Sequence, residues 1–139
     1  MALWLYCPDP SPAIAVVMKK NKLKTALIVE DDALIALATE EIVRSEGFDR
    51  IEVCSSAKAA VEYLASLAPE LLVLDAGLAD RDDGWMIAEV ARETISPPPK
   101  MLFVTGSPDA IPPEIAKLGI ILAKPCSEDQ LRRAIRHKA

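Results

Sequence analysis

Five short apolar runs, separated by segments of helical periodicity, most constrain how this chain can fold. The runs occupy residues 26–29, 51–54, 71–74, 101–104 and 120–123. All but the run at 51–54 are continuously apolar, as expected of strands that helices cover on both faces. Alternating strands and helices of this length are typical of β-α units that feed a parallel sheet. The sequence therefore predicts an α/β domain with five such units.

The segments between the runs carry apolar residues at the i, i+3, i+4 spacing of one helix face. Gly47 is placed to end the first helix, and Ser127 with Gln130 forms a capping-box signature at the start of the last. Pro108, Pro112 and Pro113 leave only about residues 114–118 for a shortened fourth helix. The predicted core-facing stripes are Leu34, Leu37 and Ala38; Ala57, Ala60, Val61 and Leu64; Ile87, Val90 and Ala91; and Leu131, Ala134 and Ile135.

Composition narrows the classes of function. A length of 139 residues with 51% hydrophobic residues suits one packed domain. The net charge of −5 opposes nucleic-acid binding, which depends on clustered Lys and Arg. No apolar run approaches the ~18 residues that span a membrane, and the start of the chain lacks the features of a signal peptide. Three scattered cysteines form no disulfide framework, so we expect a cytoplasmic protein.

Residues 1–22 do not share the alternating pattern. Met18 precedes a lysine-rich stretch and would be a natural start for the folded part. We therefore expect residues 1–22 to be a loosely ordered extension and residues 23–139 to form the domain, with a docking role for Trp4, Leu5 and Tyr6 as the alternative.

Chemically active side chains follow four of the predicted strands. In an open parallel sheet the carboxyl ends of the strands meet at one edge, which is where ligands bind. Crowded carboxylates repel one another unless a hard cation such as Mg²⁺ lies among them. A carboxylate beside such an ion and a lysine can attack phosphorus. The residues at this edge are Glu30, Asp31, Asp32, Asp75, Thr105 and Lys124.

Four motifs at these strand ends, IVEDD, LLVLDAGL, FVTG and LAKP, resemble those of response-regulator receiver domains of two-component signalling. The resemblance runs from about Lys24 to the end of the chain. It implies a flavodoxin-like, doubly wound five-stranded sheet of order 2-1-3-4-5, like that of the chemotaxis regulator. It also implies that Asp75 accepts a phosphoryl group and that Lys124 and Thr105 contact it. Mg²⁺ would be held by the acidic pair Glu30 and Asp31, by Asp75, and by the backbone carbonyl of Gly77.

The resemblance also bears on a third acid, on a cis peptide bond and on the residue that transmits the signal. Asp32 would be a third, less essential acid, and the Lys124–Pro125 bond would be cis. Ile121 stands where an aromatic switch residue is common in the family. The Thr105–Gly106 sequence and the short fourth helix are similar to those of stand-alone receivers paired with atypical sensor kinases in alphaproteobacteria.

Alternative functions remain open from the residues alone. An aspartyl-phosphate phosphatase would need a second acid two residues after its nucleophile, where this chain has Gly77. A flavodoxin-like cofactor binder would have its phosphate repelled by the acids after the first strand. A degenerate receiver that only binds partners would not need the full set of acidic, hydroxyl and lysine residues. Each of these residues could also be a helix cap or an ordinary turn residue.

We therefore expect a single-domain response regulator that is not an enzyme beyond its own phosphorylation and dephosphorylation. Its partners would be a sensor histidine kinase or histidine phosphotransfer protein and a downstream protein, because no output domain follows the last predicted helix. We expect a monomer or a phosphorylation-linked dimer that binds neither nucleic acid nor membrane.

Overall fold

Five parallel strands form one sheet. The computed structural model describes residues 23–75 and 84–137. The strands are β1 (Thr25–Val29), β2 (Arg50–Cys54), β3 (Leu71–Asp75), β4 (Lys100–Thr105) and β5 (Ile120–Ala123). Their order in the sheet is β2-β1-β3-β4-β5, so the predicted sheet and its strand order are confirmed.

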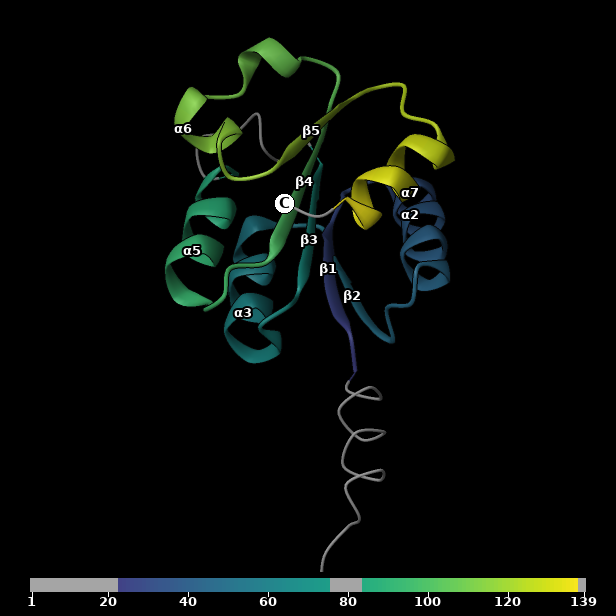
Figure 1. Cartoon of the computed structure of the whole chain (residues 1–139). Coiled ribbons are helices and arrows are strands. Elements are labelled where there is room, and N and C mark those ends of the chain that lie inside the picture. Colours follow the sequence, from purple (N-terminus) through teal and green to yellow (C-terminus); the bar gives the residue numbers. More distant parts are fainter. Residues whose placement is uncertain (1–22, 76–83, 138–139) are drawn as a thin grey trace, which may run out of the picture.

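Helices cover both faces of this sheet (Figure 1). Helices α2 (Ala33–Ser45) and α7 (Glu128–Arg136) lie side by side on one face. Helices α3 (Ala57–Leu67), α5 (Met86–Thr94) and α6 (Pro113–Ala116) lie on the other. Parallel strands need such crossovers, because the chain must return to the same end of the sheet before each new strand.

The apolar core is divided by the sheet into two clusters. Alternate side chains of a strand point to opposite faces, so each strand supplies both. Leu27 of β1 and Phe103 of β4 pack toward α3 and α5, while Ile28 and Leu102 pack toward α2 and α7. All four of these side chains are buried, as expected of central strands.

The predicted stripe of α2 is wrong. Leu34 is 79% exposed and Leu37 is 55% exposed, and Ala38 is exposed too. The buried residues of this helix are Ala36, Ile42 and Val43. The first half of α2 is apolar around most of its circumference, so its periodicity permits several orientations, and packing against the sheet and α7 selects a different one.

The other helices agree more closely with the predictions made from the sequence. Leu131, Ala134 and Ile135 of α7 are buried, and Ser127 with Gln130 forms the capping box. Gly47 follows α2 with a φ of +99°, a conformation that glycine adopts without strain. The fourth helix is short as predicted, since a 3-10 turn (Pro108–Ala110) precedes the four residues of α6.

Residues 1–22 and 76–83 lie outside the described part of the chain, and so do the predictions made for the extension and for Gly77. Within the part that is described, no helix has the length and apolarity needed to cross a bilayer.

Candidate functional site

The carboxyl ends of four strands bring the predicted site residues to one edge of the sheet. Asp75 is the last residue of β3 and Thr105 the last of β4, while Glu30 follows β1 and Lys124 follows β5. Asp75 pairs in register with Val104, so Thr105 lies one residue further along the neighbouring strand. The topology thus assembles residues that are up to 94 positions apart in the chain.

Three carboxylates form a cluster at this edge. Oxygen atoms of Glu30, Asp31 and Asp75 all lie within 4.8 Å of one another. Glu30 is 7% exposed and Asp75 is 5% exposed, whereas Asp31 is open to solvent. Oxygen-rich groups of this kind suit a hard divalent cation, and the exposed member leaves a path by which an ion can enter.

Burial has the largest effect on the pKa of Glu30. It raises the pKa of Glu30 to about 7; the negative charge of Asp75 adds to the rise, and the hydrogen bond from the backbone N–H of Asp32 opposes it. That N–H donates to Glu30 Oε2 over 3.1 Å. A cation bound within the cluster would remove the repulsion that disfavours the ionised form, so the donor set fits such an ion.

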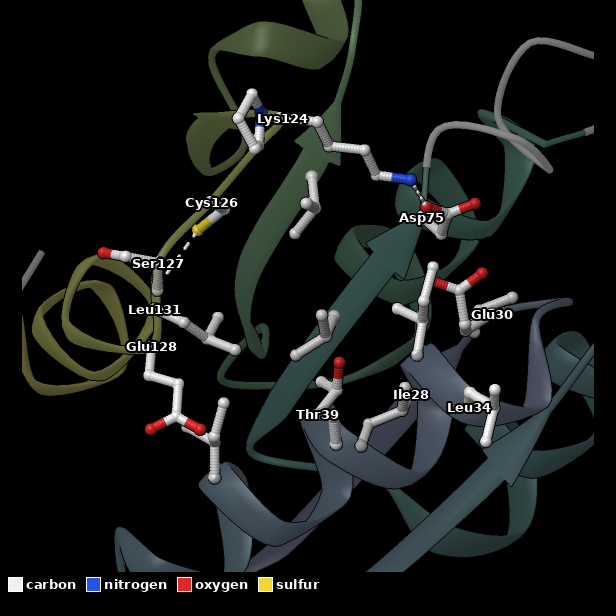
Figure 2. Close-up of a pocket in the computed structure, with 17 residues that line it drawn as sticks. Ile28, Glu30, Leu34, Thr39, Asp75, Lys124, Cys126, Ser127, Glu128 and Leu131 are labelled. Atoms are coloured by element: carbon white, nitrogen blue, oxygen red, sulfur yellow. Dashed lines mark hydrogen bonds and ion pairs between the residues drawn. The ribbon is translucent and has the colours of Figure 1, made fainter.

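Lys124 is directed at Asp75 (Figure 2). Its Nζ donates to Asp75 Oδ1 over 2.5 Å. Burial lowers the pKa of Lys124, but this hydrogen bond and the negative charges of Asp75, Glu30 and Asp31 outweigh it, so the pKa is raised overall. The lysine therefore remains a cation beside the carboxylate.

Thr105 is almost completely buried, at 2% exposure. Its Oγ1 accepts a hydrogen bond from the backbone N–H of Ser107 over 2.9 Å. Its backbone oxygen accepts from the Lys124 N–H over 2.7 Å, which ties the end of β4 to that of β5. The hydroxyl hydrogen is not used in the bond from Ser107, so it can donate to a ligand.

Asp32, the third predicted acid, caps the start of α2. Its Oδ1 accepts from the backbone N–H groups of Leu34 and Ile35 over 2.9 and 3.1 Å, which makes it the N-cap of α2. An N-cap of this kind stabilises the helix start and fixes the direction in which the chain leaves the site. The predicted cis bond between Lys124 and Pro125 is confirmed.

An apolar groove adjoins the carboxylates, and sequence analysis did not predict it. It lies between α2 and the β5–α7 connection, has a volume of about 710 Å³, and ends at Glu30, Asp75 and Lys124 (Figure 2). Ile28, Val73 and Val104, one from each of the three central strands, belong to its lining. The only sequence signal was the excess of apolar residues in the first half of α2.

Comparisons with known proteins agree with this fold. The family model for the response regulator receiver domain matches residues 26–136. The chain belongs to this family, a signalling domain of two-component systems.

Two solved structures with related sequences are the receiver domain of the response regulator PhyR from Erythrobacter litoralis and a response regulator receiver protein from Sinorhizobium medicae. The first is 28% identical with a TM-score of 0.66, covering 81% of this chain and 87% of that one. The second is 30% identical with a TM-score of 0.65, covering 82% and 92%. A receiver domain from Methylobacillus flagellatus, 22% identical with a TM-score of 0.70, covers 83% and 98% and supports the fold alone.

A curated relative is the transcriptional regulatory protein PdtaR of Mycobacterium tuberculosis. It is 31% identical over 74 residues, which are 53% of this chain. The match spans only 36% of that relative's own length.

Proposed function

We propose that this receiver domain accepts a phosphoryl group on Asp75 and passes the signal on by protein-protein contact. The observation that carries the proposal is the approach of Lys124 Nζ to within 2.5 Å of Asp75 Oδ1, beside a cluster of carboxylates. A fixed ammonium beside a carboxylate oxygen can stabilise negative charge as a phosphoryl group is transferred.

The proposed transfer uses this chain's own groups. Asp75 attacks phosphorus in line, one P–O bond forms at its carboxylate, and the bond to the donor breaks with its electron pair on the leaving group. Lys124 binds the phosphoryl oxygens, and the Thr105 hydroxyl donates to one of them. Glu30, Asp31, Asp75 and the Gly77 carbonyl would hold Mg²⁺, whose charge would offset the negative charge of the phosphoryl oxygens.

Intact-mass measurement after incubation with acetyl phosphate and Mg²⁺ tests the site. Wild type gains one phosphoryl mass, and Asp75→Asn gains none because asparagine lacks a nucleophilic carboxylate. Asp109→Asn, an exposed aspartate in the 3-10 turn, is the matched control and labels like wild type. Equal labelling of Asp75→Asn would disprove the assignment, and absence of labelling in wild type would favour a degenerate receiver.

The metal proposal has a separate test by titration. Mg²⁺ is expected to bind in the millimolar range, as is typical of a few carboxylates plus waters, and Asp31→Asn weakens it. Unchanged affinity in Asp31→Asn, measured by calorimetry, would move the metal away from this cluster.

The proposed partners are a sensor histidine kinase or histidine phosphotransfer protein and a downstream protein target, in the cytoplasm. Neither nucleic acid nor membrane is among them, and catalysis is limited to the protein's own phosphorylation and dephosphorylation. The protein is a monomer, or a dimer linked to phosphorylation.

We propose residues 23–139 as the receiver domain, so that a chain starting at Met18 folds and is phosphorylated like the full chain. A large loss of thermal stability in that variant would contradict this boundary.

A further inference from the structure

We propose that Asp32 is a positioning residue of the site: by capping α2, it keeps the carboxylates of Glu30 and Asp31 available to a divalent cation. The inference rests on the proposed function and adds a role to the site at which Asp75 is phosphorylated. Asp32 is not among the acids that form the cluster, which are Glu30, Asp31 and Asp75. The role assigned to Asp32 is therefore different from that of a cation ligand.

Asp32 contacts both the helix and the cluster. Its Oδ1 accepts from the backbone N–H groups of Leu34 and Ile35 over 2.9 and 3.1 Å. Its own backbone N–H donates to Glu30 Oε2 over 3.1 Å. Its backbone oxygen accepts from the N–H of Ala36 over 2.9 Å, which is the first hydrogen bond of the helix. The orientation of Asp32 therefore links the start of α2 to the direction of a buried carboxylate of the site.

The first turn of α2 depends on this cap, because its side chains are poorly packed. Leu34 is 79% exposed and Ile35 is 44% exposed, and Ala33 is exposed as well. The first buried residue of the helix is Ala36. The hydrogen bonds to Asp32 are thus the main local restraint on where the helix begins.

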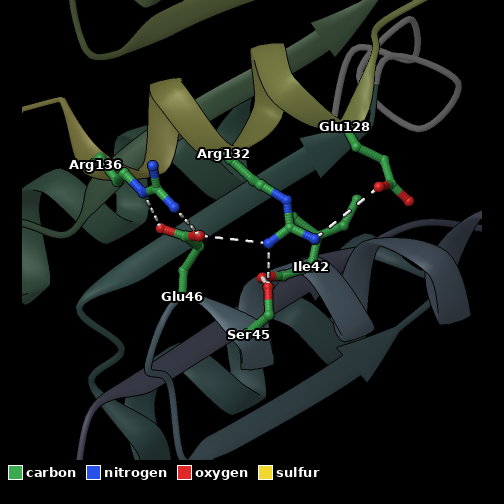
Figure 3. Close-up of polar contacts among 6 residues, drawn as sticks. All are labelled: Ile42, Ser45, Glu46, Glu128, Arg132 and Arg136. Atoms are coloured by element: carbon green, nitrogen blue, oxygen red, sulfur yellow. Dashed lines mark hydrogen bonds and ion pairs between the residues drawn. The ribbon is translucent and has the colours of Figure 1, made fainter.

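The other end of α2 is held by separate contacts with α7 (Figure 3). Arg136 donates to both carboxylate oxygens of Glu46, the C-cap residue of α2, over 2.6 and 2.9 Å. Arg132 contacts the same carboxylate over 3.4 Å and also donates to the hydroxyl of Ser45. Loss of the cap at Asp32 should therefore disturb the first turn without releasing the helix from the domain.

Without the Asp32 side chain, the start of α2 would attract a neighbouring acid. The first backbone N–H groups of a helix have no partner within the helix and carry a partial positive charge. Asp31 becomes the cap if the helix begins one residue earlier, and it is exposed, so packing does not prevent its side chain from turning. That change would direct the carboxylate of Asp31 toward the helix and away from Glu30. In the wild type, Asp32 satisfies these N–H groups, so the other two acids stay in the cluster.

Four substitutions of Asp32 separate the cap from the charge. Asn and Ser cap a helix about as well as Asp, Ala lacks an acceptor, and Gly also lacks one but costs a helix little stability. Calorimetric titration should show Mg²⁺ binding at least about tenfold weaker in Asp32→Ala and Asp32→Gly, as is typical when the support of a metal ligand is lost. Asp32→Asn and Asp32→Ser should stay within about threefold of wild type, because only a solvent-exposed charge is removed.

A second measurement needs no metal. The side-chain carboxyl ¹³C resonances of Glu30 and Asp31, recorded with chelator at one pH, should shift in Asp32→Ala and Asp32→Gly. They should stay close to wild type in Asp32→Asn and Asp32→Ser, because the cap remains. Unshifted resonances in Asp32→Gly would show that the cap does not direct these two carboxylates and would overturn the proposal.

Ser56→Ala is the matched control for loss of a helix cap. The Ser56 hydroxyl caps α3 by accepting from the Ala59 N–H over 3.1 Å. This variant should lower the Tm about as much as Asp32→Ala and leave the Mg²⁺ affinity at the wild-type value. Equally weakened binding in Ser56→Ala and Asp32→Ala would reflect general destabilisation and overturn the positioning role.

The remaining outcomes separate this inference from the proposed function. Equal weakening in all four Asp32 variants would show that the charge matters and the cap does not. Wild-type affinity in Asp32→Ala and Asp32→Gly would show that neither does. Either result overturns the positioning role, and the proposed function stands as long as acetyl phosphate labels Asp75 of the wild type. Absence of both Mg²⁺ binding and labelling in the wild type would instead reject the proposed function, and the positioning role with it.

Discussion

Lys124 Nζ lies 2.5 Å from Asp75 Oδ1, although the two residues are 49 positions apart in the chain. The ammonium balances part of the negative charge of the carboxylate cluster before any cation or phosphoryl group arrives. The ammonium should therefore favour phosphoryl transfer to Asp75 and disfavour Mg²⁺ binding.

Replacing Lys124 by methionine should separate these two effects. Loss of the ammonium slows labelling of Asp75 by acetyl phosphate at least about tenfold, since a charge contact with the transferring group is removed. The same change tightens Mg²⁺ binding about threefold, because one positive charge no longer repels the ion. Lys117→Met, an exposed lysine after α6, is the control and should change neither quantity. Slower labelling with weaker Mg²⁺ binding would show that Lys124 acts mainly by holding the site together.

The raised pKa of Glu30 predicts a pH dependence. Its pKa of about 7 in the folded protein exceeds the ordinary value of 4.5, so the folded state binds more protons between these two values. Ionisation of Glu30 therefore lowers the stability of the metal-free protein as pH rises from about 4.5 to about 7, by roughly a few kcal/mol. Urea denaturation with chelator present measures it, and Glu30→Gln should remove this part of the slope.

Metal binding should show the opposite trend with pH. A proton on Glu30 competes with Mg²⁺, so affinity rises as pH increases through about 7. In Glu30→Gln the affinity is lower and nearly constant over that interval. A wild-type affinity that does not change between pH 6 and 8, measured by calorimetry, would argue against Glu30 as a ligand.

Thr105 is expected to transmit the signal to the loop that follows it. Its Oγ1 now accepts from the Ser107 N–H, and movement of the hydroxyl toward a phosphoryl group would strain or break that contact. Ile121 belongs to the same apolar cluster as Ile111 and Ile115, and has no polar group with which to take part. Phosphorylation should therefore shift the amide resonances of residues 106–113 in wild type, and much less in Thr105→Ala.

Thr94→Ala is the matched control for that measurement, because the Thr94 hydroxyl donates to the Val90 carbonyl within its own helix α5. It should keep the wild-type shifts. If the loop resonances stay unchanged on phosphorylation while distant helices move, or if Thr105→Ala retains the full change, the signal leaves the site by another route.

Glu46, the C-cap residue of α2, should matter more to stability than Glu40 within that helix. Glu46 pairs with Arg136 and Arg132 of α7, and these contacts, the hydrogen bond from Arg136 first, lower its pKa. Its contribution is therefore present above the ordinary pKa and is lost as pH falls through the lowered one. Glu46→Gln should lower the Tm at pH 7 by a few degrees. Glu40→Gln breaks only an exposed pair with Arg44 within α2 and should change the Tm by about one degree or less. Equal effects would show that the two helices are held by apolar packing alone.

The sequence by itself determined the sheet and the membership of its carboxyl edge. Apolar runs of strand length between helical segments leave few topologies, and the residue that follows each strand must lie at that edge. Asp75, Thr105 and Lys124 could therefore be placed together without coordinates. The short fourth helix was predictable for an equally local reason, because proline cannot continue the hydrogen bonding of a helix interior.

Only the tertiary structure decided which side of α2 faces the core and what Asp32 contacts. The apolar residues of α2 surround most of its first turns, so periodicity alone selected Leu34 and Leu37, while packing buried Ile42 and Val43. The pairing of Glu46 with Arg136 joins residues 90 positions apart and leaves no local signal. The groove beside Asp75 arises from how far two helices stand apart on the sheet. That separation depends on the side chains that meet between the two helices, so it cannot be predicted from the periodicity of one segment.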